Sequence, residues 1–224
     1  LDQSAIYLKL GSLGFELSWM DKIRSANPNM EVIDLSKGVE LISGHEEDEK
    51  DARDEHKGHK HSHGGIDPHI WMSARNAKVM VDNLADALKK LLPEDSVHIA
   101  HRHQVLSDRI DSLVREIGDL LLDAKGRSFM IYHPSLSYYA RDYKLKQLAL
   151  EWEGKTPSPA HMRKLTDLGR EHQIKSILIQ SEFDSNNARI LASEIGATIV
   201  TINPLDENWP DQMLQIALKL REQW

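Results

Sequence analysis

The pattern of hydrophobic and polar positions divides the first part of the chain into short apolar runs and longer segments with helical spacing. Residues 5–10 and 31–35 are short apolar runs and predict strands. Between them, the segment from Gly14 to about Asn27 predicts a helix. Apolar residues then recur at steps of three and four from Ser73, a candidate N-cap, to about Leu92. The pattern therefore predicts α/β structure, with a second helix over residues 73–92.

A longer regular segment follows over residues 94–125. Its apolar residues fall on one stripe: Ile99, Leu106, Ile110, Leu113, Ile117, Leu120 and Ala124. A helix of this length would span about 45 Å at 1.5 Å per residue, which is more than one small domain needs. We therefore predict one long rigid helix that joins two domains.

The last part of the chain alternates between strand and helix patterns. The predicted strands are 128–133, 145–150, 176–180 and 198–202, and the predicted helices are 135–142, 158–172, 185–195 and 208–222. Such alternation indicates a parallel sheet with helices on both faces, in which ligands sit at the carboxyl ends of the strands. His133, Glu182 and Asn203 all fall at such ends.

Composition and charge narrow the range of partners. The chain has 224 residues and a formal net charge of -7, which argues against nucleic acid because phosphate requires a basic surface. No apolar run reaches the roughly 18 residues needed to cross a bilayer. The sequence has no cysteine, so a bound metal must use nitrogen and oxygen ligands.

Histidine is enriched, and five of the 12 histidines lie within residues 45–63, among acidic and basic residues. This stretch has almost no apolar residue, so we expect a mobile surface loop. Two interpretations of it stay open. It either collects metal weakly, through His56, His59, His61 and His63, or serves as a passive charged linker.

His69 and His133 are the two candidate metal ligands outside this loop. His69 follows a proline shortly before a predicted helix, and His133 stands where a predicted strand ends. Taken singly, each histidine has an alternative interpretation: His69 as a polar loop residue, which is the weaker alternative, and His133, with equal weight, as a cap of the next helix. Together with the histidine-rich loop they favour metal, since neutral imidazole suits zinc, copper, iron and nickel. Carboxylates at Glu182 and Asp206 are candidates to complete the set of ligands.

Enzymatic function has little support. The sequence lacks a cysteine nucleophile, a Gly-x-Ser-x-Gly elbow, a P-loop and a His-Glu-x-x-His helix. His101 and His103 lie two residues apart in the long helix and are interpreted as surface residues. One alternative is a zinc-dependent hydrolase with Glu182 as general base. Another is a surface adhesion protein that a metal stabilises.

Four segments resemble the metal-specific solute-binding proteins of bacterial ABC importers, the zinc and manganese receptor family. The segments are Asp67–Ser73, Tyr132–Tyr143, Glu153–Pro159 and Thr201–Leu205. The acidic, histidine-rich insertion directly before Asp67 is typical of the zinc members. The resemblance covers essentially the whole chain, and its motifs together are quite specific.

The resemblance implies two α/β lobes of parallel sheet, joined by one long helix, with the metal held in the cleft between them. The lobes would be residues 1–93, including the histidine-rich loop, and 126–224, with 94–125 as the linking helix. His69 matches a ligand of the first lobe. His133 matches a ligand of the second, where histidine points to zinc rather than manganese. The implied function is capture of zinc outside the cytoplasm for an ABC permease, by a monomer that is periplasmic or anchored to the outer face of the membrane.

Two departures from the family pattern affect the expected site. The chain starts at Leu1, directly before a predicted strand, so the first lobe is expected to lack the histidine nearest the family's N-terminus. At the fourth ligand position, Asn203 replaces the usual aspartate, and an amide oxygen is a neutral and weaker ligand. Asp206 or Glu182 would then substitute for it, or water would complete the shell. Acid is expected to release the metal, because protonated imidazole cannot bind it.

Overall fold

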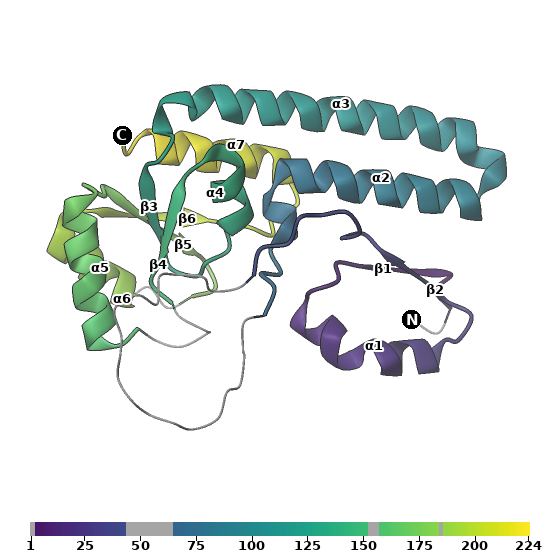
Figure 1. The fold of residues 1–224 in the computed structure, drawn as a ribbon, viewed down its shortest axis with the longest axis horizontal. Coiled ribbons are helices and arrows are strands. Elements are labelled where there is room, and N and C mark those ends of the chain that lie inside the picture. Colours follow the sequence, from purple (N-terminus) through teal and green to yellow (C-terminus); the bar gives the residue numbers. More distant parts are fainter. Residues whose placement is uncertain (1–2, 44–64, 152–156, 184–185) are drawn as a thin grey trace. The chain divides into compact units, whose positions relative to one another are not determined.

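The structure is a computed structural model that describes residues 3–43, 65–151, 157–183 and 186–224 (Figure 1). The predicted histidine-rich loop, residues 45–63, lies outside the described residues, and so does most of the segment that begins at Glu153.

The chain divides into two compact units. The first comprises Leu1–Ile70 and Lys78–His103, and the second comprises Trp71–Ala77 and Gln104–Trp224. The division into residues 1–93, 94–125 and 126–224 that the sequence suggests stays a prediction.

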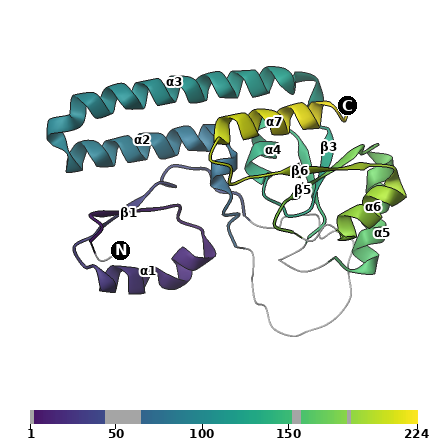
Figure 2. The ribbon, with the colours of Figure 1, turned by 180° about the vertical axis from the view of Figure 1, so that it is seen from behind.

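The first unit is built around a strand–helix–strand motif. Strand β1 (Ile6–Lys9) and strand β2 (Glu31–Asp34) pair in parallel, and helix α1 (Gly14–Ala26) makes the crossover between them (Figures 1 and 2). The carboxylate of Glu16, in the first turn of α1, accepts hydrogen bonds from the backbone N–H groups of Leu10 and Gly11 at 3.0 and 2.8 Å. This buried carboxylate fixes the turn that leads from β1 into α1.

Helix α2 (Ala74–Leu91) begins where the sequence predicts. The hydroxyl oxygen of Ser73 accepts a hydrogen bond from the backbone N–H of Asn76 at 3.0 Å, so Ser73 caps the helix as expected. Further along α2, the side-chain amide of Asn83 donates to the carbonyl oxygens of Leu35 and Lys37. Those two bonds tie α2 to the chain that leaves β2.

The predicted long helix is present as α3 (Ser96–Leu120), which is 25 residues long, and the boundary between the two units falls within it. It is shorter than the predicted 94–125, because 3₁₀ turns occupy Pro93–Asp95 and Leu122–Ala124. The predicted stripe is wrong at Leu106, whose side chain is 43% exposed, while the neighbouring Ser107 is buried. At about 100° per residue, position 106 lies within about 40° of the positions of Ile110 and Leu113 around the helix, so helical spacing does not account for the exposure of Leu106.

The second unit contains a four-stranded parallel sheet with the strand order β4-β3-β5-β6. Its strands are β3 (Ser128–Ile131), β4 (Lys146–Ala149), β5 (Ser176–Gln180) and β6 (Thr198–Ile202). The connecting helices are α4 (Ser137–Tyr143), α5 (Pro159–Glu171) and α6 (Asn186–Ile195), and α7 (Trp209–Arg221) follows β6. The predicted fold class, α/β with parallel sheets flanked by helices, is confirmed.

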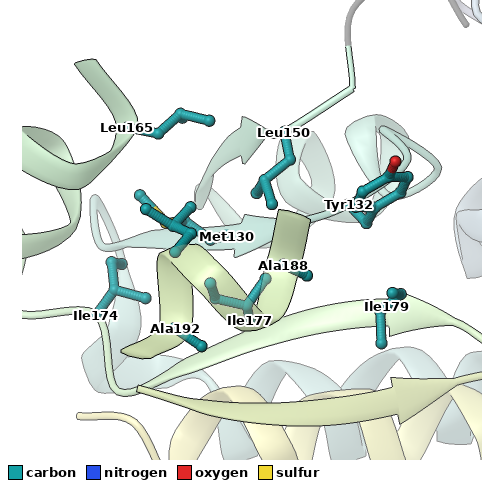
Figure 3. Close-up of a cluster of buried hydrophobic side chains, with 10 residues drawn as sticks. Met130, Tyr132, Leu150, Leu165, Ile174, Ile177, Ile179, Ala188 and Ala192 are labelled. Carbon is teal, nitrogen blue, oxygen red and sulfur yellow. The ribbon is translucent and has the colours of Figure 1, made fainter. Parts of the chain in front are cut away.

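One core of this unit lies between the sheet and helices α5 and α6. Met130, Ile177 and Ile179 project from the strands toward Ala188 and Ala192 of α6 (Figure 3). All five side chains are at most 4% exposed. Alternate residues of β3 and β5 are also buried on the other face of the sheet, where α7 lies (Figures 1 and 3). Both faces are therefore covered, as continuous apolar strands require.

Candidate metal centre

His69 lies in the loop that leads into α2, and a neighbouring carboxylate holds its ring. The Nδ1 atom is 2.7 Å from Oδ1 of Asp67, and the same oxygen accepts the backbone N–H of His69 at 2.9 Å. The two side chains are 16% and 10% exposed. Asp67 is itself fixed, because its backbone N–H donates to the carbonyl oxygen of Ile42 at 2.9 Å.

His133 follows strand β3 and has a similar arrangement in the second unit. Its Nδ1 atom is 3.0 Å from Oε2 of Glu151, which follows strand β4. The Glu151 side chain is only 7% exposed, and that of His133 is 28% exposed. The ring of Phe183 stacks on the imidazole, with a centroid distance of 5.0 Å and an angle of 15° between the planes.

Both histidines are thus oriented for the same chemistry. An ionised carboxylate only accepts hydrogen bonds, so the tautomer that satisfies each contact is the one with the proton on Nδ1. In the neutral ring the lone pair is then on Nε2, which is the nitrogen that would bind a metal. Metal-binding histidines in proteins commonly have such a carboxylate on the opposite nitrogen.

Sequence reasoning missed the two carboxylates, Asp67 and Glu151. Asp67 stands two residues before His69, in the same motif, and this spacing was the available signal. Glu151 stands two residues beyond the end of β4, at the same edge of the sheet as His133. A search for acids at every predicted strand end would have included it.

The remaining predicted ligands also follow strands of this sheet. Glu182 comes two residues after β5, is exposed, and accepts a hydrogen bond from Ser181 at 3.3 Å. Asn203 directly follows β6, and its side-chain amide donates to Asp206 at 3.3 Å. Its amide oxygen accepts the backbone N–H of Leu205 at 3.1 Å. The fold brings Asn203 and Asp206 together, and the same oxygen of Asn203 that would bind a metal takes part in this turn.

Within the described parts of either unit, no three histidine, aspartate or glutamate side chains gather in a group that could hold a metal ion. The complete set of ligands therefore stays a prediction.

Of the two histidines interpreted as surface residues, His101 is exposed, whereas His103 is half-buried and its Nε2 atom lies 2.6 Å from Asp82.

The segment that follows His69 is anchored within the second unit. The indole N–H of Trp71 donates to the carbonyl oxygen of Pro204 at 3.0 Å, and the indole N–H of Trp209 donates to the carbonyl oxygen of Trp71 at 3.1 Å. Pro204 directly follows Asn203, at the carboxyl edge of the sheet. His69 precedes Trp71 by two residues.

Comparison with known proteins identifies the family. The model of the family described as "Zinc-uptake complex component A periplasmic" matches residues 1–222. The chain belongs to this family. The family description refers to the periplasm and to zinc uptake, which agrees with the class of protein that the sequence motifs predict.

Individual relatives agree with this assignment. The zinc-binding protein AdcA of Streptococcus pyogenes serotype M6 is 30% identical over 172 residues, which are 73% of this chain and 33% of that protein. A putative metal-binding protein of Treponema pallidum is 29% identical, over 68% of this chain and 50% of that protein. The chain thus spans about a third of the length of the AdcA proteins that it matches.

Solved structures share the fold. A crystal structure of ZnuA superposes with a TM-score of 0.86 at 27% identity, covering 99% of this chain and 80% of that one. A zinc-bound ZnuA deletion mutant gives a TM-score of 0.84 at 28% identity, covering 98% of this chain and 78% of that one. Among the described residues, no helix combines the length and the apolar character that spanning a membrane requires.

Proposed function

We propose that the chain captures zinc outside the cytoplasm and delivers it to an ABC-type permease. The observation that carries the proposal is the shared arrangement of His69 and His133, each with a carboxylate on Nδ1 at 2.7 or 3.0 Å. Membership of the zinc-uptake family supports zinc as the cargo. The proposal assigns the chain no covalent chemistry and no nucleic-acid partner, and takes it to act as a monomer.

His69 and His133 bind the same zinc ion through Nε2 in this proposal. Zinc usually has four ligands, so two more come from protein or water. Asn203, Asp206 and Glu182 are the candidates, because all three follow strands β5 and β6 at the edge of the sheet where His133 lies. Imidazole with few carboxylates favours zinc over manganese, which prefers oxygen ligands.

The anchoring of Trp71 supports this pairing of ligands. Trp71 is bonded to the loop that carries Asn203, and only one residue separates it from His69. In this proposal, the short chain from Trp71 to His69 keeps His69 within reach of the zinc ion.

We expect the chain to bind one zinc ion more tightly than any further zinc ions. In this proposal the tight site is the one with His69 and His133, and the histidine-rich segment 45–63 collects further zinc weakly. Replacing His56, His59, His61 and His63 together by serine should remove the weakly bound equivalents of zinc and leave the tightly bound equivalent. Titration against a chromophoric zinc chelator measures both the stoichiometry and the affinities.

The same titration with manganese is the selectivity control, and a lower affinity for manganese is expected. Loss of the tight equivalent in the serine variant would contradict the assignment to His69 and His133. Absence of any tight equivalent in the unaltered chain would contradict the proposed capture of zinc.

A further inference from the structure

The imidazole ring of His133 is held on one edge and on one face by residues that follow two other strands. Glu151, after β4, lies 3.0 Å from Nδ1. Phe183, after β5, stacks on the ring at 5.0 Å and also contacts the ring of Tyr132 at 5.5 Å. The ring is therefore fixed in both position and rotation by its neighbours.

The backbone around His133 is fixed as well. The side-chain amide of Gln180 is buried, with 1% exposure, and donates to the carbonyl oxygen of His133 at 2.9 Å and to the hydroxyl oxygen of Ser135 at 2.7 Å. Its oxygen accepts the backbone N–H of His133 at 3.4 Å. Gln147 makes two similar bonds to Leu136 and the Ser137 hydroxyl. The turn that carries His133 is thus held by two side-chain amides from the sheet.

We propose that Glu151 is a positioning residue, which keeps the proton of His133 on Nδ1 and so directs the Nε2 lone pair to the zinc ion. This inference rests on the proposed function and deepens it, since it assigns a role to a residue outside the expected set of ligands. Phe183 and Gln180 limit the ring and backbone rotations that would otherwise have to be frozen when zinc binds. His69 has the corresponding partner in Asp67, at 2.7 Å.

The carboxylate of Glu151 favours one tautomer of the His133 ring. A carboxylate has no N–H or O–H to donate when ionised, so only the tautomer with the proton on Nδ1 satisfies it. A glutamine of the same shape carries both a donor and an acceptor. Its N–H group can donate to Nδ1, in which case the proton moves to Nε2 and the ring cannot bind zinc through that nitrogen.

Glu151→Gln is therefore the decisive variant. In the metal-free protein, nitrogen NMR of the His133 ring should show the proton on Nδ1 in the unaltered chain and a shift toward Nε2 in Glu151→Gln. Zinc affinity should fall about 10- to 100-fold, the usual effect of removing such a partner of a metal ligand. Glu151→Asp, which keeps an acceptor-only group, should retain the Nδ1 proton and more of the affinity.

Glu171→Gln is the matched control, because Glu171 is an exposed residue at the end of α5. The Glu171→Gln protein should bind zinc with the affinity of the unaltered chain. Unaltered zinc affinity in Glu151→Gln, together with loss of affinity in His133→Ala, would overturn the positioning role and leave the proposed function standing. Unaltered affinity in His133→Ala would instead overturn the choice of ligand. A proton found on Nε2 of His133 in the unaltered, metal-free chain would overturn the positioning role directly.

Discussion

His133→Ala is expected to weaken tight zinc binding by about 100-fold or more. Removing a residue that only orients a metal ligand costs about 10- to 100-fold in affinity, so removing the ligand itself should cost at least the upper end of that range. The alanine also leaves the buried carboxylate of Glu151 without its imidazole partner. Competition with a chelator of known zinc affinity measures the change.

His172→Ala is the control for this variant. His172 is an exposed histidine that caps the end of α5, so its removal takes away an imidazole from the same unit without touching the candidate site. Its zinc affinity should stay within about twofold of the unaltered chain, since exposed substitutions away from special features have small effects. Equal affinities for the two variants would remove His133 from the set of ligands.

The stoichiometry tests whether His69 and His133 share one ion. If they do, His69→Ala and His133→Ala each lose the same tightly bound equivalent of zinc. The double variant then loses no further tightly bound equivalent. If the two histidines bind separate ions, each single variant keeps the tight equivalent that depends on the other histidine. Residues that act on one ligand are coupled in this way, whereas independent sites are additive.

Much of the fold could be predicted because its elements follow from local patterns. The buried strands β3 and β5 are continuous apolar runs, as in parallel sheets covered on both faces. Helix α5 is marked by Ser158, whose hydroxyl oxygen caps the backbone N–H of His161, and by Pro159 at its first position. The ends of α3 were less predictable, because 3₁₀ turns occupy Pro93–Asp95 and Leu122–Ala124 on either side of it.

The candidate site was predictable only in part. His133, Glu182 and Asn203 could be placed at one sheet edge, since parallel strands bring their carboxyl ends together. The pairing of His133 with Glu151 could not be derived, because it depends on β3 and β4 being neighbours in the sheet and on side-chain direction. The same holds for Trp71 and Pro204, which lie 133 residues apart in sequence.

Asp142→Ala should have the largest effect on stability, lowering the free energy of unfolding of the second unit by about 2–3 kcal/mol. The Asp142 side chain is 2% exposed and accepts hydrogen bonds from the hydroxyl of Ser73 and from the guanidinium of Arg141, at 3.1 and 2.9 Å. Breaking a buried ion pair on one side leaves the partner uncompensated, at a cost of about 3–5 kcal/mol. Arg141 is 29% exposed, so water offsets part of this cost. Urea unfolding of the metal-free protein measures it.

Asp86→Ala supplies the comparison for Asp142→Ala. Asp86 pairs with Lys89 at 3.3 Å on an exposed helix surface, with a carboxylate that is 73% exposed, so its loss should change stability by less than about 0.5 kcal/mol. Asp142 also binds Ser73, two residues after Trp71, so Asp142→Ala should loosen the segment that positions His69 and lower zinc affinity as well. An unfolding midpoint in Asp142→Ala equal to that of Asp86→Ala would show that the buried pair contributes nothing to stability. A lower stability with unchanged zinc affinity would show that the Asp142 contact does not position His69.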